Sequence, residues 1–388
     1  MATPKKVLIL GGGTGGLIIS NELRKLLGSG EAEITVVDRN ERSEFRPSYL
    51  YVAFGYREPH QVSLPLSLLE RKGIRFVQAE VQGIDAANRR VETSAGTMDY
   101  DILVVSLGAE TVNIGYPSPW ELDLALKTRE ALAGFKGGTL VIGIHSNPYR
   151  CPPAPYETAM LAHFYLETRR LRDKSRIVVV STMKKPFENF GPLAAKMMSQ
   201  MLEEMGIEHI GVGGSPAITS IEGNVLEAAT GERIKFDAAF IVPPHRAPKP
   251  VAESELVKNG WAAARNPAYG DFRSEKYDDV YVVGDVVAPN VPLGMAGTIL
   301  HSYSPYVVSN IVADVKGVSI GQPTFRVFGT CALDVGGFGM AAACDFTPFV
   351  QKKKPYPDCF FLPPAKPVRI FKEFFEKMYF AWLLGEVP

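Results

Sequence analysis

One cysteine in this sequence lies in a setting that could support chemistry. Residues 141–157 read VIGIHSNPYRCPPAPYE, and apolar residues at helical spacing continue to about residue 170. This pattern predicts a helix that begins near Pro155. Cys151 would then lie close to the helix N-terminus, where partial positive charge favours a thiolate. The alternative is a buried and inert cysteine.

A glycine-rich turn near the N-terminus is the second group of residues with a chemical purpose. The sequence GGGTGG at 11–16 follows a short apolar run and leads into a helical pattern. Gly11 permits the tight turn, Gly13 lets the backbone approach a pyrophosphate, and Gly16 lets helix and strand pack closely. A second predicted strand ends at Asp38, 22 positions after Gly16, where a carboxylate can accept hydrogen bonds from a ribose. Together these features predict a dinucleotide site.

Composition limits the classes of function. The 388 residues include 42 basic and 42 acidic side chains, so no overall field attracts nucleic acid. Four cysteines without a close CxxC pair predict neither a disulfide scaffold nor a zinc site, and we expect no metal. Any disulfide is expected to be catalytic rather than structural. We see no signal peptide and no run of 18 apolar residues, and therefore expect a cytoplasmic chain without a membrane-spanning helix.

Three further segments identify the dinucleotide. Residues 279–285, DVYVVGD, are an apolar strand that ends in Gly-Asp and precedes a helical pattern. They resemble the second flavin signature of the FAD-dependent pyridine nucleotide-disulfide oxidoreductase superfamily. Residues 100–109 resemble the strand that closes the first half of that family's flavin domain, and Val77 lies in a stretch that usually frames the adenine. The resemblance implies FAD, with the Asp285 side chain on the ribityl chain. The implied cofactor-binding residues are Gly11, Gly13, Gly16, Asp38, Arg39, Val77, Gly108, Gly284, Asp285, Gly297 and Lys372.

Most members of this superfamily carry a second glycine fingerprint for NAD(P)H, and this chain lacks it. The fingerprint should follow the predicted strand at 138–144, where only Gly143 remains. Prolines and bulky side chains occupy the place where bare backbone would approach a pyrophosphate. This disfavours a type-2 NADH dehydrogenase, and Cys151 occupies the place of the hydride donor's site.

The segment CPPAPYE at 151–157 resembles sulfide:quinone oxidoreductase and its relative, flavocytochrome c sulfide dehydrogenase. Both families use two redox cysteines near the flavin, and the resemblance implies that Cys331 is the partner of Cys151. Cys331 lies in a predicted hairpin with a glycine turn. We expect Cys344 to be a small core residue on the returning strand, and Cys359 to be structural.

Two departures from these families refine the assignment. Residues 111–131 lack the third cysteine that many members have, which indicates a subgroup with two redox cysteines. Residues 46–50 also lack the cysteine to which the flavocytochrome relative attaches its flavin. Non-covalent FAD is therefore expected, and the quinone-reducing branch is favoured.

The implied reaction is the attack of hydrosulfide on a bridge between the two cysteines. Glu157 is a candidate proton acceptor; the alternative is a carboxylate stabilised in the first turn of a helix. His145 and His245 are candidates for the sulfide path, against ordinary histidines with satisfied hydrogen bonds.

The last segment of the chain predicts an amphipathic helix at 367–384. One helical face would carry the apolar residues at 371, 374, 375, 378, 379 and 382. Lysines, Tyr379 and Trp382 suit a helix in the lipid headgroup region; the alternative is a helix packed on the protein's own core or on a dimer partner. Lys372 resembles the family's lysine near the flavin and quinone.

The sequence therefore predicts an α/β protein with two Rossmann-like domains. Residues 1–115 and 245–315 would form a glutathione-reductase-like FAD domain, 116–244 an inserted second domain with the first redox cysteine, and 316–388 a C-terminal segment with the second cysteine and the membrane helix. We expect a peripheral membrane enzyme, on the cytoplasmic side, that oxidises sulfide to polysulfide or elemental sulfur and reduces quinone, whether ubiquinone, menaquinone or a caldariella-type quinone. The alternatives are a soluble sulfide dehydrogenase that serves a cytochrome, a type-2 NADH dehydrogenase-like flavoenzyme, and a non-catalytic flavin redox sensor. No nucleic-acid partner is expected, and the oligomeric state stays open, a homo-oligomer included.

Overall fold

The apolar run at the N-terminus becomes β1 (Lys5–Leu10), near the centre of a seven-stranded sheet. The computed structural model describes residues 3–290, 293–321 and 324–384. β1 pairs in parallel with β2 and β9, and its last four side chains are buried, because both faces of the sheet are covered. The other strands of this sheet are β2 (Ala32–Asp38), β5 (Arg75–Gln78), β9 (Ile102–Val105), β21 (Ala264–Asn266), β22 (Asp271–Ser274) and β23 (Val280–Val282).

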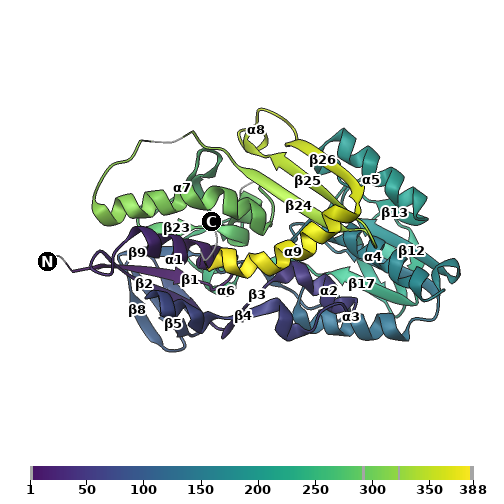
Figure 1. Ribbon diagram of the computed structural model, residues 1–388, viewed down its shortest axis with the longest axis horizontal. Helices are drawn as coiled ribbons and strands as arrows, with labels where there is room; N and C mark the ends of the chain where they lie inside the picture. Colours follow the sequence, from purple (N-terminus) through teal and green to yellow (C-terminus); the bar gives the residue numbers. More distant parts are fainter. Residues whose placement is uncertain (1–2, 291–292, 322–323, 385–388) are drawn as a thin grey trace.

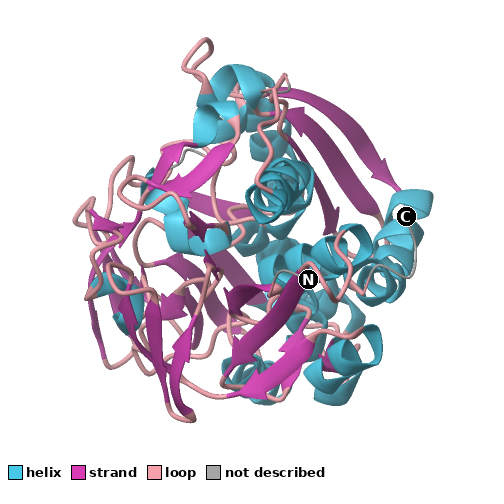
Figure 2. Cartoon of the chain, turned by 90° about the vertical axis from the view of Figure 1, so that its left-hand side faces the viewer, coloured by secondary structure: helices cyan, strands magenta, loops and turns pink. Residues whose placement is uncertain are grey.

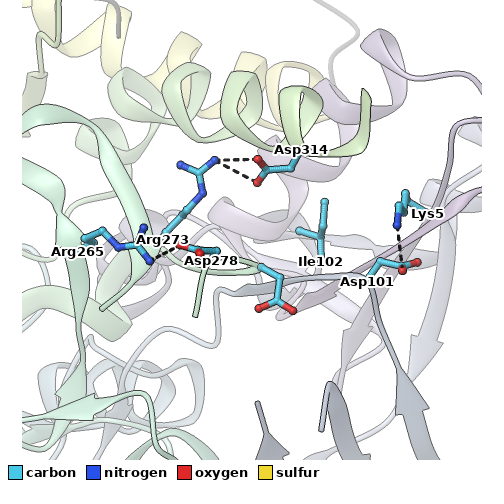
Figure 3. A pocket seen from close by; sticks show the side chains of 8 residues that line it. Lys5, Asp101, Ile102, Arg265, Arg273, Asp278 and Asp314 are labelled. Atoms are coloured by element: carbon cyan, nitrogen blue, oxygen red, sulfur yellow. Dashed lines mark hydrogen bonds and ion pairs between the residues drawn. The ribbon is translucent and has the colours of Figure 1, made fainter. Parts of the chain in front are cut away.

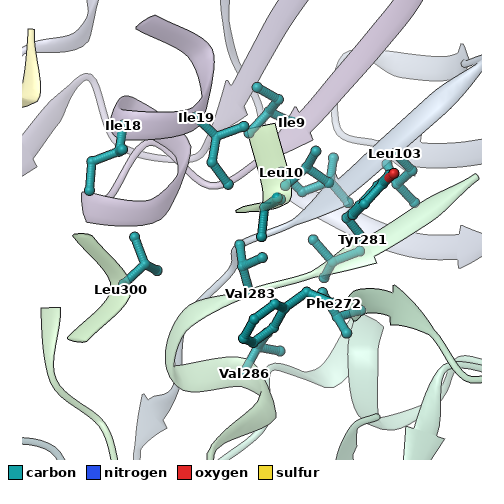
Figure 4. Packing of buried hydrophobic residues seen from close by; sticks show 14 of the residues in the cluster. Ile9, Leu10, Ile18, Ile19, Leu103, Phe272, Tyr281, Val283, Val286 and Leu300 are labelled. Atoms are coloured by element: carbon teal, nitrogen blue, oxygen red, sulfur yellow. The ribbon is translucent and has the colours of Figure 1, made fainter. Parts of the chain in front are cut away.

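Two helices from opposite ends of the chain cover one face of this sheet. They are α1 (Thr14–Leu26) and α7 (Gly297–Lys316), which contact each other. Figure 4 shows Ile19 of α1 and Leu300 of α7 near Leu10 of β1, all three of them buried. Each such side chain contributes about 1.5–3 kcal/mol when it leaves water. An antiparallel sheet of β6 (Val81–Asp85), β7 (Arg90–Thr93) and β8 (Gly96–Asp99) and the short helix α6 (Lys249–Ala252) complete this part.

A second parallel sheet contains the strand that precedes Cys151. Its order is β13-β12-β11-β17, with β11 (Gly138–Ile144), β12 (Ser175–Ser181), β13 (Ile207–Gly211) and β17 (Ala238–Val242). Helices α3 (Leu122–Gly134), α4 (Ala154–Thr168) and α5 (Pro192–Glu204) and a hairpin sheet of β14 (Ile218–Glu222), β15 (Val225–Ala228) and β16 (Arg233–Lys235) surround it. The chain enters and leaves this part through a two-stranded ribbon of β10 (Glu110–Thr111) and β18 (His245–Arg246).

The C-terminal part is an antiparallel sheet followed by a helix. The predicted hairpin is present as β24 (Phe328–Asp334) and β25 (Gly339–Asp345), and a third strand, β26 (Asp358–Ala365), pairs with β25. Helix α9 (Lys366–Leu383) lies across the middle of the molecule and contacts β24, β25 and α1 (Figure 1). The side chain of Trp382 lies outside the described residues. Within the described ranges, every helix is too short or too polar to cross a bilayer.

Shorter elements fill the connections between these sheets. They are β3 (Arg42–Glu44), α2 (Tyr49–Ala53), β4 (Ser63–Pro65), β19 (Val257–Lys258), β20 (Trp261–Ala262) and α8 (Thr347–Val350). The side view in Figure 2 shows the strands of the C-terminal sheet apart from the N-terminal sheet, with helices between them.

The structure contains a disulfide that the sequence did not indicate. Cys344 and Cys359 are joined, because the register of β25 and β26 places them directly opposite each other. Cys344 is buried in the core as expected, although it is bonded to Cys359, and the pairing of Cys151 with Cys331 stays a prediction. Cys151 and Cys331 are free thiols.

Candidate active site

A single large cavity lies between the two parallel sheets and helix α9. Its volume is about 1360 Å³, at or above the range of roughly 300–1,000 Å³ for most small-molecule sites. One end is lined by the glycine turn after β1 and by Asp38, and the other by Cys151 and Cys331. The cavity therefore connects the nucleotide motif to the two thiols.

The glycine turn has the geometry that a pyrophosphate site requires. A Cβ on Gly13 would meet no atom within 4 Å, so the backbone there faces open space. A Cβ on Gly11, whose φ is +103°, would lie 2.3 Å from the carbonyl oxygen of Ser106, and one on Gly16 would lie 1.8 Å from the Gly11 oxygen. Gly16 therefore serves helix–strand packing. The Asp38 carboxylate accepts the N–H groups of Gly12 at 2.7 Å and Asn40 at 2.8 Å and also lines the cavity.

The structure brings most of the other predicted cofactor residues to the same cavity. Its wall includes Arg39, Gly108, Gly284, Asp285, Gly297 and Lys372. Burial raises the pKa of Asp285, although Arg150 and Arg46 oppose that shift. Val77 is placed differently: it lies on β5, paired with Val37, and packs against the main core. Residues 79–82 line the cavity instead, so the strand end rather than the strand would frame an adenine.

The two candidate redox cysteines come from different parts of the fold and meet at this cavity. Cys151 precedes α4, has a φ of +55°, and donates its N–H to the carbonyl oxygen of Met295 at 2.9 Å. Cys331 lies on β24, and both thiols are half-buried on the cavity wall. Both cysteines pack against the same cluster of buried side chains.

The expectation of a thiolate at Cys151 is wrong. Burial raises the pKa of the Cys151 thiol to about 12, and the Glu157 carboxylate raises it further against an opposing effect of Lys372. Burial likewise raises the pKa of Cys331. The loss of water around the sulfur therefore outweighs the favourable helix N-terminus, and both groups are neutral thiols near neutral pH.

Glu157 and Lys372 form a buried ion pair beside the cysteines. Glu157 lies in the first turn of α4, and its Oε1 atom binds Lys372 Nζ of α9 and accepts the Asp334 N–H at 2.8 Å. Burial raises the pKa of Glu157, although Lys372 opposes that shift. Burial lowers and Glu157 raises the pKa of Lys372, with a net upward shift. Acid and base are thus held against each other next to two thiols.

Helix α9 is fastened over the cavity by three ion pairs on one side. Besides Lys372, Arg369 binds Asp334 at 3.0 Å, and Glu376 binds Arg57 at 2.8 Å. Tyr379, one turn further, is within 2.5 Å of the Thr14 hydroxyl at the glycine turn. The predicted helix is present, and its apolar residues differ in exposure: Tyr379 is buried, whereas Phe371 and Phe374 are exposed. The helix has a cavity side and an outer side because it forms the wall between them.

His145 and His245 do not line the cavity in the described part of the chain. His245 is buried, and its ring nitrogens contact the Pro243 oxygen at 2.8 Å and Arg150 Nε at 3.3 Å. Burial and Arg150 lower the pKa of His245 to about 3, so it is a neutral partner of the arginine.

Glu121 lies between two arginines beside the cavity. Burial opposes ionisation of Glu121, yet Arg46 and Arg150 hold its pKa at about 2. The cavity wall beside Cys151 therefore carries an Arg–Glu–Arg cluster that sequence reasoning missed.

A smaller hollow of about 390 Å³ lies at the amino ends of β1 and β9 in the first sheet (Figure 3). Its acidic residues are already paired with basic side chains of the protein: Asp101 with Lys5, Asp278 with Arg265, Asp314 with Arg273, and Asp279 with Arg89. These pairs neutralise the hollow and leave the large cavity as the candidate site.

These features are typical of a dinucleotide-dependent oxidoreductase with a cysteine pair. Two parallel sheets enclose one cavity, the glycine turn leaves open space at Gly13, and two thiols lie at the far end of the cavity. Comparison with known proteins supports this class. Residues 5–139 match the pyridine nucleotide-disulphide oxidoreductase family, and residues 126–243 match the central part of the flavoprotein chain of sulfide dehydrogenase (flavocytochrome c).

Individual relatives include two kinds of quinone-linked enzyme. The sulfide-quinone reductase of Aquifex aeolicus is 26% identical to this chain. The alignment, 415 positions long with its gaps, spans 97% of this chain and 90% of that protein. The type II NADH:quinone oxidoreductase of Staphylococcus saprophyticus is 27% identical over 82% of this chain and 84% of its own length. The crystal structure of the Aquifex aeolicus sulfide:quinone oxidoreductase has the same fold, with a TM-score of 0.83 and 22% identity over 98% of this chain and 92% of that one.

The chain is similar to the pyridine nucleotide-disulphide oxidoreductase family over residues 5–139 and has sulfide:quinone oxidoreductases among its relatives, and FAD is its cofactor. The predicted α/β fold is confirmed. The residues present fit this group. The open backbone at Gly13, the carboxylates of Asp38 and Asp285, and the cavity volume of about 1360 Å³ suit a dinucleotide with an attached ring system.

Proposed function

We propose that this protein is a sulfide:quinone oxidoreductase in which Cys151 and Cys331 form the reactive pair. The observation that carries the proposal is that these two thiols, from separate parts of the chain, lie on one cavity wall with the Glu157–Lys372 pair. A thiol pair in the cavity of a flavoprotein suits sulfur chemistry, since disulfides exchange with soft sulfur nucleophiles.

The residues support a balanced reaction. Hydrosulfide attacks the oxidised Cys151–Cys331 bridge, one cysteine becomes a persulfide, and the other leaves as a thiolate. The Lys372 ammonium, which opposes the upward pKa shifts of both thiols, stabilises that thiolate, and Glu157 can take the proton that sulfide releases. FAD, when bound, supplies the acceptor for the two electrons. The net change is loss of two electrons and one proton from hydrosulfide and gain of two electrons and two protons by the quinone.

The local structure after β11 argues against NADH as the donor. The side chains of Ile218 and Ile241 fill the space at Gly143, where a Cβ would lie 2.8 Å from each of them. Gly143 lies within β11, and residues 145–153 after the strand, HSNPYRCPP, contain no glycine that could take the place of Gly13. The first turn of α4, including Ala154 and Glu157, faces the same cavity as the glycine turn rather than a second nucleotide site.

The cavity also leads to an exposed apolar surface, which we define as the aromatic rim: Phe360, Leu362, Ile370, Phe371 and Phe374. Phe360, Leu362 and Phe371 both line the cavity and are exposed to solvent. The same C-terminal segment carries exposed lysines at 352–354, 366 and 377. An exposed apolar patch on a lysine-rich segment is suited to the headgroup region of an anionic membrane, from which a quinone could reach the cavity.

Vesicle binding tests the membrane part of the proposal. Phe371→Ser/Phe374→Ser should lower co-sedimentation with phosphatidylglycerol vesicles at least several-fold. Leu26→Ser, a similarly exposed apolar residue at the end of α1, should leave it unchanged. Equal binding of the two variants would contradict the assignment of the aromatic rim.

The match of residues 126–243 to the flavocytochrome c sulfide dehydrogenase chain favours one second candidate, a sulfide dehydrogenase that passes electrons to a cytochrome. Steady-state assays separate the two. With sulfide as donor, decylubiquinone should be reduced at a much higher rate than cytochrome c. A higher rate with cytochrome c would favour the second candidate, and no rate with either acceptor would contradict both.

A further inference from the structure

The Cys344–Cys359 disulfide shares one face of the C-terminal sheet with Cys331. Cys331 on β24 lies directly opposite Ala342 on β25, and Cys344 is two residues further along β25. Directly opposed residues and residues two apart point to the same side of a sheet. Cys359 is directly opposite Cys344 on β26, so three sulfur atoms lie on this face.

Small residues separate Cys331 from Cys344. The two cysteines occupy one diagonal of a four-residue square, and Gly329 and Ala342 occupy the other. Diagonal neighbours are roughly 7–8 Å apart at Cα, with Cβ atoms closer. Rotation of the two side chains and a strand shift of about 1 Å would bring the sulfurs to bonding distance. Cys331 and Cys344 also line the same cavity.

The disulfide is not needed to hold its two strands together. β25 and β26 are already paired from Ala341 opposite Leu362 to Asp345 opposite Asp358. A bridge between residues that are already opposed in this ladder adds little to the definition of the fold. The disulfide lies beside the half-buried Cys331 thiol in the large cavity, which places it within reach of the candidate redox pair.

We propose that Cys344–Cys359 is a second redox-active disulfide, which oxidises the Cys151/Cys331 dithiol to the bridge that reacts with sulfide. In the first step the Cys331 thiolate attacks Cys344, the Cys344–Cys359 bond breaks, and Cys359 leaves as a thiolate. In the second step Cys151 attacks Cys331, the Cys331–Cys344 bond breaks, and Cys344 leaves. Two electrons and two protons pass from Cys151 and Cys331 to Cys344 and Cys359, and no external oxidant is required.

This role would matter because the cysteine pair is poorly placed for outside oxidants. Both thiols are half-buried on the cavity wall, so a diffusing oxidant has restricted access to them. A disulfide on the neighbouring strand needs no diffusing reagent. The inference rests on the proposed function for its purpose, but the exchange itself depends only on the positions of the four cysteines.

Two matched double variants test the exchange. Cys151→Ser/Cys359→Ser retains Cys331 and Cys344. Cys151→Ser/Cys344→Ser retains Cys331 and Cys359, which are two strand spacings and two residues apart, or roughly 12 Å. The FAD-loaded proteins are treated anaerobically with diamide, quenched in acid with N-ethylmaleimide, and mapped by peptide mass spectrometry. The first variant should form its internal disulfide at least tenfold faster than the second. Equal rates, or no bond in the first variant, would overturn the proposal.

The wild-type protein gives an independent measurement that does not depend on either variant folding. Mapping across graded ratios of reduced to oxidised glutathione should reveal the Cys331–Cys344 mixed disulfide at intermediate ratios. Its absence at every ratio would overturn the exchange. Neither measurement uses sulfide or quinone, so a failed sulfide assay would contradict the proposed function while leaving the exchange to be decided by the mapping.

Discussion

The buried ion pair between α4 and α9 allows a quantitative prediction. The exposed fractions of the Lys372 and Glu157 side chains are 12% and 4%, so Lys372→Met leaves a carboxylate in the interior without its cation. Removing one partner of a buried pair costs about 3–5 kcal/mol of unfolding free energy. Lys354→Met is the matched control, because Lys354 and Asp358 form an ion pair with exposed fractions of 49% and 51%. Such a surface pair contributes about 0–1 kcal/mol.

The pH dependence of this cost follows from the pKa of Glu157. Burial raises that pKa, and Lys372 restrains the shift, so Lys372→Met should raise it further. A carboxyl with a raised pKa in the folded state contributes stability that is fully present below its ordinary pKa and is lost as pH rises through the folded value. The deficit of the variant should therefore be largest at alkaline pH and shrink as the pH falls through the raised pKa of Glu157, because the carboxyl then takes up a proton.

Urea unfolding of the FAD-loaded proteins, followed by circular dichroism in a fixed excess of FAD, measures these differences. The double variant Glu157→Gln/Lys372→Met should recover much of the loss, since it removes the buried charge. A Lys372→Met cost no greater than that of Lys354→Met, or a cost independent of pH, would refute the reasoning about the ion pair.

Three other outcomes are expected. Gly13→Ala should change the unfolding free energy of the apoprotein by less than about 0.5 kcal/mol, because a Cβ there meets no protein atom. The same change should raise the FAD dissociation constant about tenfold or more, which corresponds to about 1.4 kcal/mol. Unchanged FAD affinity by calorimetry would contradict the placement of the pyrophosphate. Cys151→Ser and Cys331→Ser should each abolish sulfide-dependent bleaching of the flavin while the visible spectrum shows bound FAD, and normal bleaching in either variant would remove that residue from the pair. Trichloroacetic acid should release FAD into the supernatant, since residues 46–50 contain no cysteine, and a yellow pellet would show covalent attachment.

Local sequence patterns were sufficient for the nucleotide site. The turn at 11–16 and the acid at Asp38 are read within one strand–helix–strand unit, and each constraint on Gly11, Gly13 and Gly16 is a short-range steric one. The glycine hairpin around Cys331 and the last helix were found for the same reason. In each case neighbours in sequence determine the conformation.

Features that depend on distant contacts were missed. β26 contains two prolines, which argue against a central strand. They are tolerated because β26 lies at the edge of its sheet. Since the strand was not predicted, the Cys344–Cys359 bond could not be predicted either. Glu157 and Lys372 are 215 residues apart in sequence. The pKa of Cys151 was mistaken because the helix N-terminus can be read from sequence, whereas the burial that outweighs it cannot.

The most direct test of the proposed function is an anaerobic titration of the purified FAD-loaded protein, followed at the visible flavin band. Stoichiometric sulfide should bleach the flavin rapidly, NADH at the same concentration should not, and decylubiquinone added after sulfide should restore the colour. Rapid bleaching by NADH, or a flavin that stays oxidised after sulfide is added, would contradict the assignment of the cysteine pair as the site that accepts electrons from the donor.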